Sequence, residues 1–141
     1  MKAKEYLHQA YRLDHRINSD IEEMARLREM ASSVSAPVFG EKVQTSRSAE
    51  APFVRCVEKI MLLEEQINNE IDTLVDLKEQ IRGVIDRVTD TDERMVLRYR
   101  YVHNYTWEQI GDELNADKST VRRWHSKALL HAEVPENPIL I

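Results

Sequence analysis

Residues 106–130, TWEQIGDELNADKSTVRRWHSKALL, decide the fold of this chain. Their first part predicts a short helix from about Thr106 to Leu114, because the apolar residues recur at helical spacing. These apolar residues are Trp107, Ile110 and Leu114. Thr106 suits the N-cap of this helix, since Gln109 follows it at the spacing of a capping box. The stretch therefore opens with a clear helix start.

A tight turn and a second helix follow. Asn115 is the expected turn residue, because asparagine tolerates the left-handed backbone in which many helices end. Asp117 can cap the next helix and complement its dipole, and we predict that this helix runs from about Lys118 to His131. Gly111 fits a place where the two helices approach closely. The pattern is typical of a helix-turn-helix.

The predicted second helix has two different faces. Its inward face carries Val121, Trp124, Ala128 and Leu129. Its outward face carries Lys118, Ser119, Arg122, Arg123, Ser126 and Lys127. Four of these outward residues are cationic, and no acid occurs between Lys118 and His131. In a helix-turn-helix the second helix enters the DNA major groove, where an arginine can bind a guanine edge through two hydrogen bonds. The alternative is an ordinary helical hairpin with a solvated basic face.

Position along this helix separates the candidates for DNA contact. Early turns usually reach the base edges. The base-reading candidates are Lys118, Ser119, Arg122 and Arg123. Ser126 and Lys127 lie later in the helix, and we assign them to backbone phosphates.

The segment before the hairpin supplies a third helix. Residues 89–103, TDTDERMVLRYRYVH, begin with Thr and Asp caps and continue with apolar residues on one side. These apolar residues are Met95, Val96, Tyr99 and Val102. This helix is expected to pack across the hairpin and complete a three-helix domain.

From Glu93 to Leu130 the chain resembles region 4 of the sigma-70 family of transcription factors. The matching segments are ERMVLRYRY, TWEQIGDEL, the Ser-Thr-Val-Arg-Arg run and the Lys-Ala-Leu ending. The resemblance implies a domain that reads the −35 element of a promoter and touches the flap of RNA polymerase. It covers about a quarter of the chain and is specific at the level of the superfamily.

The same resemblance implies roles for single residues. It implies base reading for Lys118, Ser119 and Arg122. It also implies places near the phosphate backbone for Arg98, Thr106, Trp107 and Lys127. The chain departs from the family at Ser119, where an acidic residue is common, and at Trp124, where an aliphatic residue is usual. Both departures bear on the DNA target and not on the fold.

Two long helices are predicted before this domain. Residues 2 to about 33 carry an apolar stripe, and a loop at about 33–51 follows, marked by Pro37 and Gly40. The second helix, from Pro52 to about Val88, carries an apolar residue at every seventh position, which is typical of a coiled-coil seam. The repeat consists of Phe53, Ile60, Ile67, Leu74, Ile81 and Val88.

The expected fold is therefore all-α, with a long antiparallel helical hairpin followed by a three-helix helix-turn-helix domain. The predicted parts are an oligomerisation hairpin at 1–88, a DNA-binding domain at 89–133 and an apolar tail at 134–141. The stripe of the second helix is wider than one partner helix needs, so we expect a homo-oligomer, most simply a dimer. A monomeric hairpin with a slightly exposed seam is the alternative.

Composition excludes several other classes of protein. The net charge of −5 argues against a generally basic nucleic-acid coat protein and confines DNA binding to the C-terminal third. A lone Cys56 and five scattered histidines do not predict a metal site, and no motif predicts a cofactor or an enzyme. No apolar run predicts a membrane contact, and we expect the protein to be located in the cytoplasm of a bacterial host cell.

The chain as a whole resembles small regulators encoded by phages and prophages of Gram-positive bacteria, related to the ArpU and RinA type of late-gene regulator. The segments that carry the resemblance are AKEYLHQAYRLDHRINSDIEEMARLR and INNEIDTLVDLKEQI. It implies a transcription regulator that binds double-stranded DNA and activates late phage genes, with host RNA polymerase as a further partner. The alternative is a small terminase-like subunit that recognises DNA for packaging, since those proteins also join a helix-turn-helix to a helical hairpin.

Overall fold

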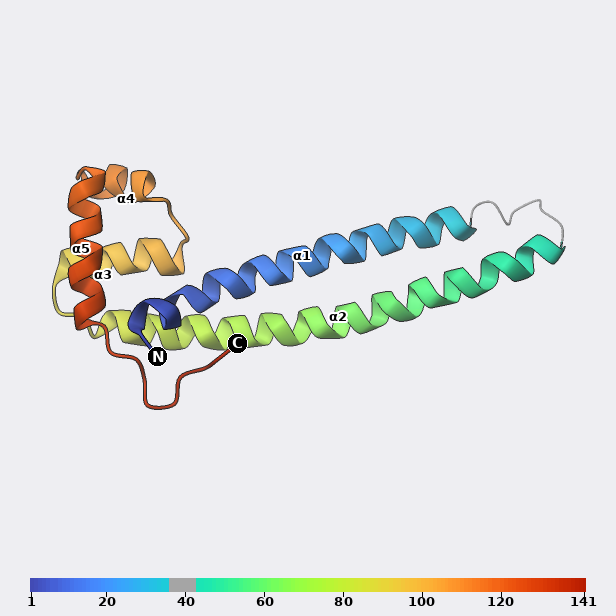
Figure 1. Ribbon diagram of the computed structural model, residues 1–141, viewed down its shortest axis with the longest axis horizontal. Coiled ribbons are helices and arrows are strands. Elements are labelled where there is room, and N and C mark those ends of the chain that lie inside the picture. The colour runs from blue at the N-terminus through green and yellow to red at the C-terminus, as the bar shows by residue number, and fades with distance from the viewer. Residues whose placement is uncertain (36–42) are drawn as a thin grey trace. The chain divides into compact units, whose positions relative to one another are not determined.

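A computed structural model describes residues 1–35 and 43–141 of the chain. These residues form helices joined by short connections, with an extended tail after the last helix (Figure 1). The predicted all-α class and the order of hairpin and helix-turn-helix are confirmed. Helix α1 spans Ala3–Ser35 and helix α2 spans Val43–Asp86. None of the described helices is long and apolar enough to cross a membrane.

The described residues divide into two compact units. One unit joins residues 1–14 with 73–141, and the other consists of 15–72 without the residues outside the described ranges. The first unit therefore contains the start of α1 and the end of α2 together with the whole C-terminal region. The division runs through both long helices, so it does not follow the sequence boundary that we placed at residue 88.

In the second unit, α1 and α2 pair in antiparallel fashion. Arg16 Nε donates to Glu70 Oε2 at 2.8 Å, and Gln66 Nε2 donates to Asp20 Oδ2 at 3.2 Å, so a step forward along α1 matches a step back along α2. Glu70 is a buried acid in the apolar seam, and burial, followed by a hydrogen bond with Asp20, raises the pKa of its carboxyl. A polar group at a seam position favours one helix register over its alternatives.

The start of α2 corrects our loop prediction. Helix α1 continues to Ser35 and α2 begins at Val43, so both helices extend into the predicted 33–51 loop. The central part of that loop, residues 36–42, lies outside the described residues. Pro52 is inside the helix rather than at its first turn. The prediction gave the proline too much weight: a proline removes one helical hydrogen bond, but the preceding Ala49, Glu50 and Ala51 favour a helix.

The side chains of the seven-residue repeat are buried toward the C-terminal end of α2 and become more exposed toward its start. Ile67, Ile81 and Val88 are buried, Ile60 and Leu74 are half-buried, and Phe53 is 38% exposed. Helix α2 ends at Asp86, so Val88 lies just beyond it and not in its last turn.

Within the first unit, the backbone of the C-terminal tail forms hydrogen bonds with side chains of α1 and α2. The side chain of Gln9 accepts from Ile141 N at 3.2 Å and donates to Ile139 O at 2.9 Å. The side chain of Gln80 accepts from Ile139 N at 3.0 Å and donates to Asn137 O at 3.1 Å. Tyr6 donates its hydroxyl to the same Gln80 oxygen at 2.7 Å. Two glutamines thus hold the extended tail against α1 and α2.

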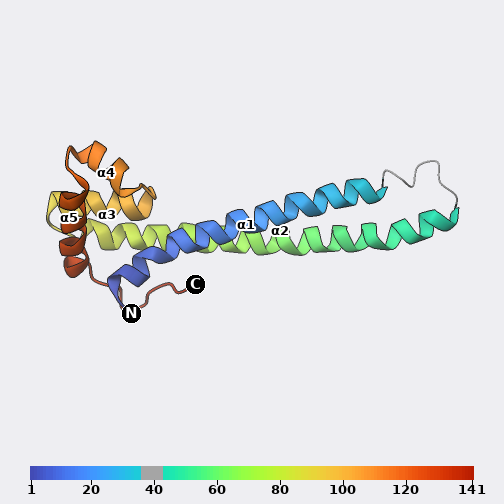
Figure 2. The same ribbon diagram turned by 45° about the horizontal axis from the view of Figure 1, so that its top comes forward.

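Helices α3, α4 and α5 form a three-helix domain (Figure 2). Helix α3 spans Thr91–Leu97, α4 spans Trp107–Leu114 and α5 spans Lys118–His131. The core of this domain contains one buried apolar residue from each helix: Val96, Ile110 and Val121. The predicted boundaries of α4 and α5 are confirmed, because the predicted caps are present at both helix starts.

The predicted helix at 89–103 is not a single regular α-helix. Beyond Leu97 it continues as a π-helical turn over Arg98–Val102, in which His103 N donates to Arg98 O at 3.1 Å. Asn104 then ends the helix with a left-handed backbone, φ 58°. The wider turn shifts the apolar face beyond α3, and Tyr101 is buried although the helical pattern did not select it. Leu97, the last residue of α3, is also buried and was also not selected.

Candidate nucleic-acid interface

Helix α4 begins with a reciprocal pair of hydrogen bonds. Gln109 N donates to Thr106 Oγ1 at 3.2 Å, and Thr106 N donates to Gln109 Oε1 at 2.9 Å. This capping box satisfies two backbone donors that the first helical turn leaves unpaired. Thr106 was predicted to lie near a phosphate, and its side chain is exposed while it caps the helix.

The turn between α4 and α5 is fixed by three residues. Asn115 has the predicted left-handed backbone, with φ 52° and ψ 47°. A Cβ on Gly111 would lie 2.6 Å from the carbonyl oxygen of Ala116, so only glycine fits there. Asp117 accepts a hydrogen bond from Thr120 N at 2.8 Å, and bonds from Thr120 lower the pKa of this carboxyl. We predicted that the two helices approach closely at Gly111, but the tight contact is with the backbone of the turn, and Val121 of α5 would lie 3.9 Å from the added Cβ.

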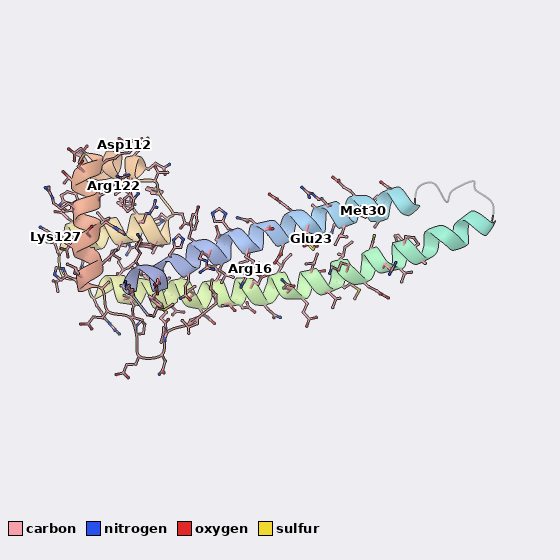
Figure 3. The ribbon with its side chains drawn as sticks, in the orientation of Figure 1. Arg16, Glu23, Met30, Asp112, Arg122 and Lys127 are labelled. Atoms are coloured by element: carbon pink, nitrogen blue, oxygen red, sulfur yellow. The ribbon has the colours of Figure 1, made fainter. Side chains whose placement is uncertain are left out.

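The outward face of α5 is solvent-exposed along its length. The exposed side chains are Lys118, Ser119, Arg122, Arg123, Ser126 and Lys127, which is the whole predicted set. The buried face of the helix carries Val121, His125 and Ala128. Figure 3 shows the side chains of Arg122 and Lys127 along α5. The recognition candidates therefore share one accessible helical surface.

Three more of the predicted contact residues already have partners. Lys118 Nζ forms an ion pair with Glu108 Oε1 at 2.8 Å, and the hydrogen bond from Lys118 lowers the pKa of Glu108. Both side chains are largely exposed, so this pair exchanges easily for a stronger anion. The hydroxyl of Ser126 donates to Arg122 O at 3.1 Å, which turns it toward its own helix. Arg98 is half-buried and lies 3.7 Å from Asp86, so it contacts α2.

Trp107 is half-buried and packs inside the domain. Its ring meets the ring of His125 edge-on at 4.8 Å, and the guanidinium of Arg100 lies 4.2 Å from its ring centre. The hydroxyl of Tyr101 lies 2.7 Å from Nε2 of His125 on the other side. Although we predicted Trp107 to lie near a phosphate, its ring is occupied by these contacts.

The sequence reading missed His125 and Glu93. His125 is 7% exposed, and burial lowers its pKa to about 4, with a smaller effect from Lys4 and Arg100. Glu93 is buried and lies 2.7 Å from His131 Nδ1, which connects α3 to the end of α5. The helical spacing of His125 from Val121 was the available signal, but we considered the histidines only as possible metal ligands.

Comparison with known proteins gives one result. A family model described as "Protein of unknown function (DUF722)" matches residues 10–130, which include most of the hairpin, all of α3 and α4, and α5 except its last residue. No curated protein and no solved structure matches the chain.

Proposed function

The chain belongs to the DUF722 family, and we propose that it is a sequence-specific DNA-binding regulator of transcription. The observation that carries the proposal is the outward face of α5, where four exposed cations follow one another without an acid. These cations are Lys118, Arg122, Arg123 and Lys127. They stand out in a chain whose net charge is −5, so the positive potential is local.

The geometry of the turn supports the same proposal. The capped start of α5 and the close approach at Gly111 fix the angle between α4 and α5, as a helix-turn-helix requires to present its second helix. The first turns of α5 carry Lys118, Ser119 and Arg122, and these are the positions that reach base edges in such domains. The resemblance to sigma-70 region 4 supports action through host RNA polymerase on phage genes.

Replacing Arg122 with alanine is expected to weaken binding to the specific DNA site by about 1 to 3 kcal/mol and to relax the sequence preference at one position. The reason is that a bidentate arginine contact distinguishes guanine from the other bases. Footprinting across the source genome would find the site, and fluorescence anisotropy on that duplex and on mutated duplexes would measure the change.

Arg26→Ala is the matched control, because Arg26 is also an exposed arginine on a helix and lies outside the DNA-binding domain. It should leave specific binding nearly unchanged. Equal losses for Arg122→Ala on specific and random DNA would mean that Arg122 touches only phosphate. Absence of binding by the unmodified protein to any duplex at low salt would refute the proposed function.

We also propose that the chain acts as a dimer. Helix α2 exposes apolar side chains that α1 does not cover, including Val54 at 46% and Met61 at 64% exposure. Val54 and Met61 are seven residues apart and share one face of the helix. A second copy that covered this face would bring two recognition helices to one DNA site.

The double substitution Val54→Asp and Met61→Asp is expected to convert the dimer to a monomer without loss of helicity, because both side chains are exposed and two charges disfavour apolar contact. Light scattering gives the mass and circular dichroism the helix content. Glu58→Ala, at a neighbouring exposed position, should keep the dimer. A mass of about eight or more chains for the unmodified protein would instead favour the DNA-packaging alternative.

A further inference from the structure

The first turns of α1 carry an exposed cationic face. Lys4, His8 and Arg12 are spaced by four residues, so they lie on one side of the helix, and all three are exposed. Neither Lys4 nor Arg12 takes part in an ion pair with another described residue. This face is separate from α5, and the sequence reading assigned it no role.

A further cation joins this face from the π-helical turn. Arg100 donates from Nη1 to Tyr105 O at 3.0 Å, and its guanidinium lies against the ring of Trp107. These two contacts hold it in place. Burial lowers the pKa of His8, and the charges of Arg12, Arg100 and Lys4 lower it further, in that order. The charges of Lys4, Arg12 and Arg100 therefore act on the same small region around His8.

A pocket of about 230 Å³ lies where the two elements meet. Its lining consists of His8, Tyr11, Arg100, Tyr101, Asn104 and Thr106. Asn104 contributes a buried amide oxygen that has no hydrogen-bond partner among the described residues. The wall thus combines cationic and polar groups with an unsatisfied acceptor, which suits a hydrated anion because a bridging water can donate to the amide.

The pocket adjoins the base-reading end of the interface. Thr106, in its wall, is the N-cap of α4, and Glu108 in the first turn of α4 pairs with Lys118 at the start of α5. His8 and Thr106 in the pocket wall, and the Glu108–Lys118 ion pair, therefore link the start of α1 with the first turn of α5 within one compact unit. In helix-turn-helix complexes the helix before the recognition helix crosses the DNA backbone, so phosphates lie beside its start.

We propose that Lys4, His8 and Arg12 of α1, together with Arg100, bind backbone phosphates of the DNA that flank the site read by α5. This inference rests on the proposed function. The contacts carry no sequence information, since phosphates are the same in every duplex. Their effect is to raise affinity and to fix the position of the three-helix domain on the DNA.

The test is the full-length double variant Lys4→Gln and Arg12→Gln, measured by anisotropy on the footprinted duplex and on an unrelated duplex between 50 and 200 mM salt. Each lost phosphate contact should reduce the salt slope by about 0.9 and the affinity roughly tenfold at 0.1 M salt, equally on both duplexes. The control is Arg26→Gln with Arg28→Gln, which changes the net charge equally at exposed positions of the same helix.

The outcomes separate this inference from the proposed function. Weaker binding and a shallower slope for the first pair, but not for the control pair, support the phosphate contact. If the unmodified protein binds its site and both pairs behave alike, the phosphate contact is refuted while the DNA-binding function stands. A loss confined to the specific duplex also refutes it, because that pattern belongs to base reading. An unmodified protein that binds no duplex refutes both.

Discussion

Replacing Gly111 with alanine is expected to lower the free energy of unfolding by about 3 kcal/mol. The new Cβ would lie 2.6 Å from the carbonyl oxygen of Ala116, which is backbone and cannot turn away. The turn must therefore shift, and overpacking of this kind typically costs about 1 to 3 kcal/mol, and occasionally more. The shift also changes the angle between α4 and α5. The reason is that it disturbs the hydrogen bond that Ala116 N donates to Gly111 O at 3.0 Å in the turn between them. Chemical denaturation followed by circular dichroism measures the loss.

Gly83 provides a matched control within the same compact unit. It lies inside α2, and a Cβ there would meet nothing within 4 Å. Alanine at this position should stabilise the protein by about 0.5 to 1 kcal/mol, because alanine loses less backbone entropy in a helix than glycine does. Equal effects at the two positions, in either direction, would show that close approach at the turn does not constrain residue 111.

The helix-turn-helix could be predicted from the sequence because its signals are local. Thr106 with Gln109, Asn115, and Asp117 each determine the backbone within three or four residues, and the structure has all of these caps. The outward set on α5 follows from helical spacing and charge, which are equally local. The seven-residue repeat predicted the long helix α2 for the same reason.

The features that the sequence did not reveal depend on contacts between distant residues. Residues 1–14 join the compact unit of the three-helix domain through partners more than 70 residues away, as Tyr6 does with Gln80. The face formed by Lys4, His8 and Arg12 gains its proposed role only from that contact. The π-helical turn at Arg98–Val102 escaped prediction because it interrupts the 3.6-residue period on which the prediction relied.

The position of His125 shows how tertiary packing overrides a composition signal. It lies in a helix that carries four exposed cations, and its place on the buried face was not predicted. In the structure the ring of His125 stacks with the ring of Tyr101 and meets the ring of Trp107 edge-on. These contacts bury it inside the domain. A buried imidazole makes the stability of the three-helix domain sensitive to pH.

We expect His125 to reduce stability by about 3 kcal/mol as the pH falls from 7 to 4. Burial lowers its pKa to about 4 from the ordinary 6.5. Between these values the unfolded chain binds a proton that the folded chain does not, so protonation favours unfolding. A difference of about 2.5 pKa units corresponds to about 3 kcal/mol at 1.36 kcal/mol per unit. Above pH 7 the ring is neutral in both states and contributes no slope.

His125→Gln isolates this effect, because glutamine offers Tyr101 a hydrogen-bond acceptor but does not titrate. Its hydrogen-bond partner Tyr101 does not titrate over this range, because burial raises the pKa of Tyr101 to about 12. Urea denaturation at several pH values from 7 to 4 gives the free energy of unfolding of both proteins. The effects of the other titrating groups, including Glu70, cancel in the difference between the two. At pH 7 the variant should be the less stable protein. Its disadvantage should disappear as the pH falls, because only in the unmodified protein must residue 125 lose a proton on folding. Parallel curves would mean that the imidazole is as easily protonated in the folded domain as in water.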